Sequence, residues 1–319
     1  MPNAHAFIRG LNHEALVMRS LNIVFGEFAR GCRQCQLGVK SVLFITGLCP
    51  LNCFYCPVDR ERFGRDVMFI NDRPVKKFPD DILDELDRAG SNGLAITGGD
   101  PIMVVDRVVE LVKILKNEYG PGFHIHMYTH ALNLSEDAVR KLAGSGIDEV
   151  RIHAINPAQL SGKLGLLRVL RDAGVELGLE VPALPRFEDG IVKVAELLIT
   201  NGLISFVNLD ELDVSPANIN NLVSMGYRPG PNGNVIGSLD AGLRIASEIR
   251  RRWPWISINV CTSHYKDLAQ IGARLFRTNM RVSAGDESVL DDGTVESQGS
   301  KGILIKLRIG GREYTVENY

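Results

Sequence analysis

The most regular feature of the chain is an alternation of short apolar runs, rich in β-branched residues, with stretches in which apolar residues recur every three or four positions. The short runs predict strands, and the longer stretches predict amphipathic helices. Strands that alternate with helices are typical of successive βα units around a parallel sheet. The predicted strands cover residues 41–46, 93–97, 123–129, 149–154, 175–181, 205–209 and 256–261.

Several of the intervening helices have readable ends. Pro79, followed by two aspartates, predicts a helix start, and Gly90 predicts the end of that helix. Ser135 is predicted to cap a second helix, and Pro101 is predicted to open a third. Ser238 is predicted to cap a helix late in the chain.

This repetition predicts an α/β fold, a partial or complete parallel βα barrel over residues 41–279. In barrels and in open parallel sheets alike, the chemistry lies beyond the carboxyl ends of the strands. Residues 1–40 are expected to form a helical arm.

The remaining residues, 280–319, are expected to form a small β extension. Residues 301–319 alternate around Gly310-Gly311, which predicts a β-hairpin, and residues 284–302 are rich in Gly, Ser and Asp, which predicts a linker or mobile loop.

Composition excludes several classes of protein. The 319 residues are 45% hydrophobic, enough for a large core, and the net charge of -2 gives no global basic field for nucleic acid or anionic membranes. No stretch approaches the roughly 20 apolar residues of a membrane span, and the first residues lack the order of a signal peptide. We therefore expect a cytoplasmic protein.

The cysteines carry the clearest chemical signal. There are six, too few for a disulfide scaffold, and Cys49, Cys53 and Cys56 fall in the loop after the first predicted strand. Three thiolates on one loop can wrap one metal centre, and they leave the fourth iron of a [4Fe-4S] cluster open for a ligand. A zinc knuckle is the alternative, but zinc normally takes a fourth nearby Cys or His, and none closely follows Cys56.

With Tyr55 before its last cysteine, this loop resembles the C-x3-C-x-aromatic-C loop of the radical S-adenosylmethionine (SAM) superfamily. The resemblance implies a [4Fe-4S] cluster on the three cysteines, with SAM on the free iron and the Tyr55 backbone facing the adenine. It covers about residues 31–279 and is strongest to an uncharacterised branch related to pyruvate formate-lyase activating enzymes.

The segment Gly98-Gly99-Asp100-Pro101 ends the second predicted strand and is similar to the family's GGEP-type segment, with Asp in place of the commoner Glu. By resemblance, this segment contacts the methionine amino group of SAM. Residues near the ends of the fourth and fifth strands, here His153 and Glu180, would contact the SAM ribose and carboxylate.

The activity implied is reductive cleavage of SAM to a 5'-deoxyadenosyl radical that abstracts hydrogen from a substrate, with a ferredoxin or flavodoxin-like electron donor. The sequence leaves the substrate open between a small metabolite, a tRNA base and the glycine of a partner enzyme, as in a glycyl-radical-enzyme activase. The alternative of another class is a non-catalytic Fe-S or zinc-binding protein.

Other polar side chains are expected near the barrel mouth. The period of two along residues 123–129 places Tyr128 and His130 on the interior face, with His124 deeper as a satisfied core group. With Asn208 and Asp210, at the end of the sixth strand, they are candidate catalytic residues.

A second metal site is a weaker hypothesis. Cys32 and Cys35 form a C-x2-C pair before the first strand, and Cys261 with His264 could complete a site for zinc or a second Fe-S cluster. A strand of five residues would separate the two ends by roughly 15 Å unless the arm folds back, which argues against a shared site.

The run 250–255, Arg-Arg-Arg-Trp-Pro-Trp, could stack on nucleic acid. A helix end, where cations are favoured, followed by a proline stop is the simpler interpretation.

Overall fold

The computed structural model describes residues 15–17, 22–291, 293–299, 302–309 and 312–318. Its centre is a run of parallel strands, each paired with the next, and each lies within two residues of a predicted strand. The predicted βα architecture is therefore confirmed. The strands are β3 (Lys40–Thr46), β6 (Gly93–Gly98), β7 (His124–Thr129), β8 (Glu149–Ile152), β9 (Glu176–Pro182), β10 (Phe206–Asp210) and β11 (Ser257–Cys261).

The barrel is partial, because no ladder in the described part of the chain joins β3 to β11. Antiparallel strands extend both edges instead. β2 (Ile23–Phe25) pairs with β11 and carries β1 (Ala15–Val17), while β4 (Phe69–Ile70) pairs with β3 and carries β5 (Arg73–Pro74).

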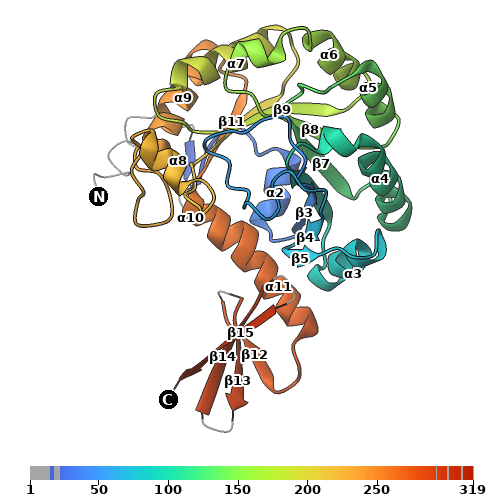
Figure 1. The fold of residues 1–319 in the computed structure, drawn as a ribbon, viewed down its shortest axis with the longest axis vertical. Coiled ribbons are helices and arrows are strands. Elements are labelled where there is room, and N and C mark those ends of the chain that lie inside the picture. Colours follow the sequence, from blue (N-terminus) through green and yellow to red (C-terminus); the bar gives the residue numbers. More distant parts are fainter. Residues whose placement is uncertain (1–14, 18–21, 292, 300–301, 310–311, 319) are drawn as a thin grey trace.

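Amphipathic helices cover the outside of these strands (Figure 1). Their apolar faces bury residues such as Ile82 and Leu86, and Gly90 ends its helix with a left-handed φ of 58°, which favours glycine. The Ser135 hydroxyl accepts from the Ala138 N–H at 3.2 Å, as predicted for a cap. The main outer helices are α3 (Asp80–Ala89), α4 (Val105–Tyr119), α5 (Glu136–Ala143), α6 (Leu164–Asp172), α7 (Glu188–Thr200) and α9 (Ser238–Arg252).

The prediction that Ser238 caps α9 is wrong. Ser238 is the first residue of that helix, and its hydroxyl donates to the Ala183 carbonyl at 2.7 Å and accepts from the Leu212 N–H at 2.8 Å. The hydroxyl therefore ties the helix to the ends of β9 and β10 rather than to its own first turn.

Shorter helices complete the barrel. Pro101 opens η1 (Pro101–Val104), a 3-10 turn that leads into α4, and η2 (Pro157–Leu160) precedes α6. The insertion between β10 and α9 contains α8 (Ile219–Ser224). After β11 come α10 (Ser263–Tyr265) and a π-helical segment, η3 (Lys266–Gly272).

The segment before β3 differs from a purely helical arm. It contributes two edge strands and the helix α2 (Arg30–Gln36), which lies in the middle of the barrel in Figure 1. Its contacts are with the amino-terminal halves of strands: the Gln34 amide donates to the Asn92 carbonyl at 2.9 Å, and the Lys40 Nζ donates to the Gln34 side chain at 3.1 Å. Helix α2 thus closes the floor of the barrel.

The carboxyl-terminal segment forms a separate antiparallel sheet, joined to the barrel through α11 (Ala273–Val282) (Figure 1). Ile309 of β14 stands opposite Arg312 of β15, so the two pair as a hairpin. The prediction of a linker over residues 284–302 is wrong, because β12 and β13 lie within it and pair in this sheet. The strands are β12 (Glu287–Val289), β13 (Val295–Gly299), β14 (Gly302–Ile309) and β15 (Arg312–Asn318).

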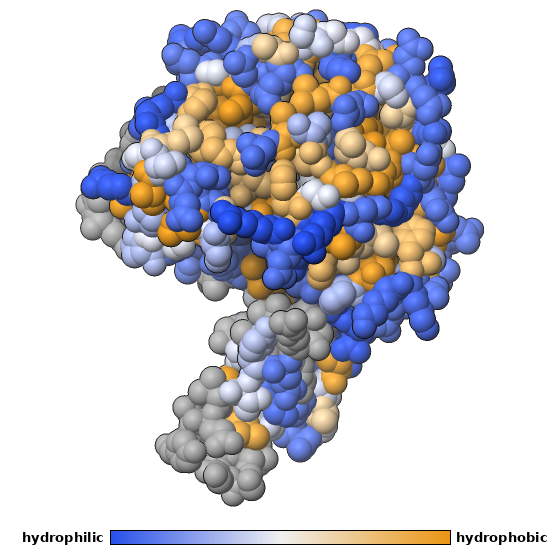
Figure 2. Space-filling model, in the orientation of Figure 1, coloured by the Kyte–Doolittle hydropathy of each residue, from blue (hydrophilic) through white to orange (hydrophobic). Residues whose placement is uncertain are grey.

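The surface in Figure 2 is unevenly divided: apolar side chains gather over the middle of the barrel face, and hydrophilic ones dominate its rim. No helix among the described residues is both long and apolar enough to cross a membrane.

Candidate active site

The three clustered cysteines lie on the loop between β3 and β4, at the carboxyl end of β3. Backbone hydrogen bonds close this loop at its base: the Gly47 N–H donates to the Arg65 carbonyl, and the Gly64 N–H donates to the Gly47 carbonyl, both at 2.8 Å. Within the loop, the Cys56 N–H donates to the Cys53 carbonyl at 3.0 Å. All six cysteines are free thiols.

An ion pair clamps the two ends of the loop together. The Arg107 guanidinium, from α4, donates to both Asp66 oxygens at 2.8 and 2.7 Å and to the Ile45 carbonyl at 3.1 Å. Asp66 also accepts from the Thr46 hydroxyl at 2.9 Å. Because Thr46 ends β3 and Asp66 follows the loop, this bidentate pair fixes the width of the loop.

Gly98 and Gly99 lie directly beside this loop. The Gly99 N–H donates to the Thr46 carbonyl at 2.7 Å, and the Asp100 N–H donates to the Leu48 carbonyl at 2.8 Å. A Cβ on either glycine would lie 2.2 Å from a carbonyl oxygen, and Gly98 has a φ of +141°. Only glycine allows this approach.

The next two residues of the segment lie behind that surface. Asp100 is fully buried, and its carboxylate accepts from the Ile102 N–H at 3.2 Å and from the His130 N–H at 3.3 Å. Pro101 is buried as the first residue of η1. The carboxylate that stands in place of the family's Glu thus caps a helix instead of facing the cavity.

The three thiols do not converge as closely as the ligands of a single zinc ion. Tetrahedral zinc with Zn–S bonds of about 2.3 Å holds its sulfurs about 3.8 Å apart. Among the described residues, the one trio of His, Cys, Asp or Glu whose donor atoms all lie within 4.8 Å of one another contains no cysteine. The thiols of Cys49, Cys53 and Cys56 are therefore not all within 4.8 Å of one another.

Burial raises the pKa of the Cys49 thiol to about 11 and also raises the pKa of Cys53 and Cys56. The free thiols are consequently neutral at physiological pH, and a bound cation is what would hold them as thiolates.

A cavity of about 320 Å³ opens over these thiols. Its lining includes the three cysteines, Tyr55, Gly98 and Gly99. The lining also includes polar and charged side chains from the ends of later strands: Tyr128, His130, His153, Glu180, Asp210, Glu211, Asp213 and Lys266. The structure thus brings most of the expected polar residues together at the carboxyl ends of the strands.

Tyr55 is held on both sides. Its hydroxyl lies 3.0 Å from His153 Nε2, and its carbonyl accepts from the Asn218 amide at 3.0 Å. The Tyr55 backbone, which the resemblance directs toward the adenine, therefore already has a partner for its carbonyl, from the insertion that contains α8.

Glu180 is the best-supported side chain of the wall. Its Oε1 accepts from the Tyr128 hydroxyl at 2.8 Å, and its Oε2 accepts from the Asn208 amide at 2.6 Å and from Arg151. Asn208 does not line the cavity but lies beneath it, where it also donates to the Cys32 sulfur at 3.1 Å. Such a network fixes the Glu180 carboxylate in one position.

Charge on the cavity wall is concentrated at the ends of β10 and β11. Burial, reinforced by the Glu180 carboxylate, raises the pKa of Asp210 to about 7, although the Lys266 cation opposes the shift. Lys266 donates to the Glu211 carbonyl at 3.2 Å and forms an ion pair with Asp213. Burial lowers the pKa of His153 to about 3, so its imidazole is neutral.

The remaining cysteines lie closer to one another than the barrel geometry predicts. Because α2 folds back under the barrel, Cys32 contacts Asn208, whose register partner Asn259 is two residues before Cys261. The arm does fold back, so the separation of roughly 15 Å, expected only for an arm that stays outside, does not apply. Even so, the described thiols of Cys32, Cys35 and Cys261 do not converge within 4.8 Å of one another, and His264 is exposed.

Sequence reasoning missed Lys266, Asp213, Arg151 and Asn218. Arg151 lies on β8 and His153 directly follows that strand, so the period of two along the predicted strand 149–154 places both on the interior face. The other three lie in segments beyond strand ends, where only the fold places them at the cavity.

Comparison with known proteins agrees with this geometry. Residues 43–174 match the model of the radical SAM superfamily. A putative glycyl-radical enzyme activating enzyme, MJ0021 of Methanocaldococcus jannaschii, is 32% identical over 294 residues, covering 88% of this chain and 74% of that protein. A PqqA peptide cyclase of Bradyrhizobium diazoefficiens is 31% identical over 113 residues, which cover 35% of this chain and 27% of the cyclase.

Among solved structures, Streptococcus suis SuiB bound to S-adenosylmethionine superposes with a TM-score of 0.50 at 13% identity, covering 81% of this chain and 59% of SuiB. At that identity the likeness concerns the fold, and the chain spans little more than half of SuiB. The family uses a [4Fe-4S] cluster and SAM. On the length and identity of the match to the archaeal relative, the chain belongs to the radical SAM superfamily and is a radical SAM enzyme.

Proposed function

We propose that Cys49, Cys53 and Cys56 hold the [4Fe-4S] cluster and that SAM binds in the cavity above them. The cluster, when bound, supplies the electron that cleaves SAM to a 5'-deoxyadenosyl radical. The single observation that carries the assignment is the cavity itself, which these three thiols share with the Gly98-Gly99 backbone and Glu180.

The chain's own residues position SAM and exclude water. Gly98 and Gly99 present backbone without side chains, which lets the methionine end of SAM approach closely. Glu180, oriented by Tyr128 and Asn208, is the carboxylate available to the ribose hydroxyls, and His153 offers a neutral imidazole beside Tyr55. Asp100 and Pro101 lie behind this backbone and fix the start of η1.

The substrate is proposed to be a glycine of a partner protein, as in a glycyl-radical-enzyme activase. The support is the relative of that description, which matches 88% of this chain. A tRNA substrate is less well supported, because Arg251 and Arg252 are paired with Glu248 and Glu196. The electron donor is proposed to be a ferredoxin or flavodoxin-like protein in the cytoplasm, where the free thiols would stay reduced.

Cluster assignment is tested by the Cys53→Ala variant, reconstituted anaerobically with iron and sulfide. We expect it to lose the cluster and to yield no 5'-deoxyadenosine with dithionite and SAM, because two thiolates cannot retain the site-differentiated cluster. Cys261→Ala is the matched control. Retention of a wild-type cluster and product by Cys53→Ala would contradict the assignment.

The same control addresses the second site proposed for Cys32, Cys35 and Cys261. Iron and zinc contents that are the same in wild type and in Cys261→Ala would remove that proposal. Loss of further metal in Cys261→Ala would support it.

Substrate class is tested by fractionating a cell extract into macromolecules and small molecules. An activase predicts that the macromolecular fraction increases 5'-deoxyadenosine formation and gains a glycyl-radical doublet in electron paramagnetic resonance, and that ribonuclease has no effect. The activase proposal would be overturned if the small-molecule fraction alone increased 5'-deoxyadenosine formation. It would also be overturned if ribonuclease abolished the increase caused by the macromolecular fraction.

A further inference from the structure

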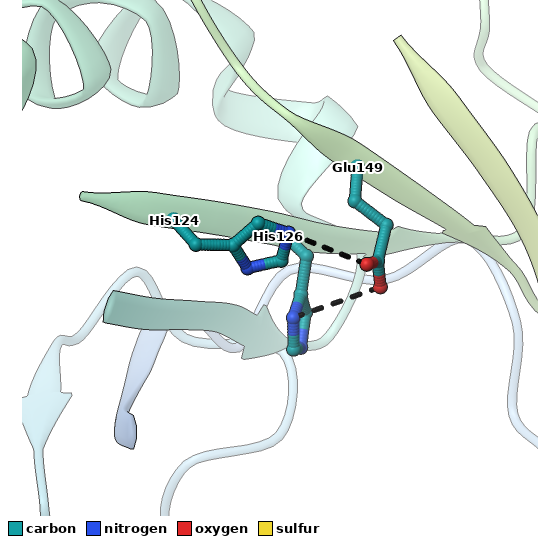
Figure 3. Close-up of side chains that lie close together, drawn as sticks. All are labelled: His124, His126 and Glu149. Carbon is teal, nitrogen blue, oxygen red and sulfur yellow. Dashed lines mark ion pairs between the residues drawn. The ribbon is translucent and has the colours of Figure 1, made fainter. Parts of the chain in front are cut away.

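A different group of metal-ligand side chains lies near the amino ends of the strands, below the cavity. His124 and His126 come from β7, and Glu149 begins β8. Figure 3 shows the three side chains pointing toward one another. Their donor atoms all lie within 4.8 Å of one another, which no other trio of His, Cys, Asp and Glu among the described residues achieves.

The distances suit a single ion. His124 Nε2 lies 3.4 Å from Glu149 Oε2, and His126 Nδ1 lies 3.8 Å from Glu149 Oε1. Ligands at about 2.0–2.1 Å from a tetrahedral zinc ion lie about 3.4 Å from each other. An ion between these atoms therefore needs only small side-chain shifts.

Several of these atoms have no other partner. His126 is 1% exposed and Glu149 is 0% exposed, yet both nitrogens of His126 and Oε2 of Glu149 lack a hydrogen bond. A buried polar group without a partner is costly, and an ion or a water molecule that completes it is a usual explanation.

Two neighbouring cationic side chains, Lys40 and Arg151, each contact one atom of the trio. Lys40 Nζ lies 2.8 Å from His124 Nδ1, which leaves Nε2 directed at Glu149. Arg151 bonds Glu149 Oε1 through its Nε and bonds Glu180 through a terminal nitrogen, so two carboxylates share its charge. His126 Nδ1 thus faces the Glu149 oxygen that Arg151 also contacts, whereas His124 Nε2 and Glu149 Oε2 converge with neither atom held by a cation.

Helix α2 closes this space from below. At Gly31 a Cβ would lie 2.6 Å from His126 Nδ1 and 2.6 Å from an Arg151 nitrogen, so the helix backbone rests directly against the trio. An ion in this place is shielded from solvent and bridges β7 to β8 above α2; the three side chains leave its fourth tetrahedral position for a water molecule.

We propose that His124, His126 and Glu149 bind one divalent transition-metal ion, zinc or ferrous iron, at the floor of the barrel. Two imidazoles and a carboxylate are donors that both ions accept. The site is separate from the cysteine loop and does not depend on the function proposed above. The ion would stabilise the folded barrel in proportion to its affinity.

The proposed site is tested by measuring the metal content of the full-length Cys49→Ser/Cys53→Ser/Cys56→Ser variant, which lacks the cluster ligands. Expressed with both zinc and iron supplied, it should retain about one ion per chain by plasma mass spectrometry, and the identity of the ion is read directly. Adding His126→Gln or Glu149→Gln should reduce that content to background, while Glu136→Gln, an exposed carboxylate of α5, should leave it unchanged.

Cobalt replacement distinguishes this site from the thiols of Cys32, Cys35 and Cys261. Cobalt on imidazole and carboxylate gives visible d–d bands without thiolate-to-cobalt charge transfer in the near ultraviolet. If the cysteine variant fails to fold, anomalous scattering at the zinc and iron edges from wild-type crystals should show a peak between the three side chains. A water molecule in that position, metal content unaffected by His126→Gln and Glu149→Gln, or a thiolate band in the cobalt spectrum would overturn the proposal.

Discussion

At the residue scale, the site depends on a few side chains whose chemistry is set by burial. Glu180 accepts three hydrogen bonds and is held in place. Asp210 lies on the neighbouring strand, two residues beyond the register partner of Glu180, and burial raises the pKa of its carboxyl group. The wall therefore combines one fixed anion with one group that can change its charge near neutral pH.

Asp210 should make stability fall as pH rises. Its folded pKa of about 7 is above its ordinary value of 3.8, so between these values the folded state binds more protons than the unfolded state. The stabilisation is complete below about pH 4 and is lost as pH rises through about 7. Chemical denaturation at several pH values should show this decline in wild type and not in Asp210→Asn, while Asp106→Asn, on an exposed face, should resemble wild type.

The sequence identified the residues of this site unevenly. The cysteines and Gly98-Gly99 are contiguous motifs on loops at strand ends, so spacing and strand position were enough to place them. Arg151 and Lys266 act through partners from other strands, and only tertiary structure pairs Arg151 with Glu180 or brings Lys266 to Asp213.

At the element scale, the active face depends on how closely the loop after β3 approaches the end of β6. Gly98→Ala should lower stability by more than about 3 kcal/mol and weaken SAM binding, because its Cβ would meet the Thr46 carbonyl at 2.2 Å and its φ is positive. The matched control is Gly165→Ala, in α6, where nothing lies within 4 Å of the new Cβ. Denaturant unfolding measures the stability of the two variants, and SAM titration measures their affinity for SAM. Equal losses in Gly98→Ala and Gly165→Ala would contradict the close-approach argument.

Removing the ion pair that clamps the cysteine loop should lower stability less than Gly98→Ala does. Arg107→Ala leaves Asp66 without its bidentate partner, and since both side chains are partly exposed we expect a loss of about 1–2 kcal/mol in stability and faster release of cluster iron to a chelator. Arg140→Ala removes an exposed charge from α5 and serves as the control. Iron release at the wild-type rate in Arg107→Ala would show that the clamp does not hold the loop.

At the scale of the whole molecule, the alternation of strands and helices was enough to predict the barrel, since each element's pattern is local. The position of α2 was not predictable, because a helix of seven residues carries no signal for the place where it docks. Of the small terminal sheet, the sequence predicted only the hairpin of β14 and β15. Residues 284–302 have a polar composition typical of loops, so β12 and β13, which pair through backbone hydrogen bonds, were not predicted.

The terminal sheet should be dispensable for the barrel. Among the described elements, the main contacts between the terminal sheet and the rest of the chain are those of α11 with β12 and β14, so a chain that ends at Ser283 should keep its cluster and its uncoupled cleavage of SAM. Iron content and 5'-deoxyadenosine yield measure this, with full-length protein as the control. A fall in cluster content after truncation would show that the sheet supports the active face.

The pairing of β2 with β11 has a consequence for synthesis. Ile23, Val24 and Phe25 are buried against residues 258–260, which leave the ribosome more than two hundred positions later. At about 5–20 residues per second, this apolar segment waits on the order of ten seconds or more for its partner strand. β2 is thus among the last strands to meet its partner, and in the nascent protein we expect its apolar side chains to be available to a chaperone.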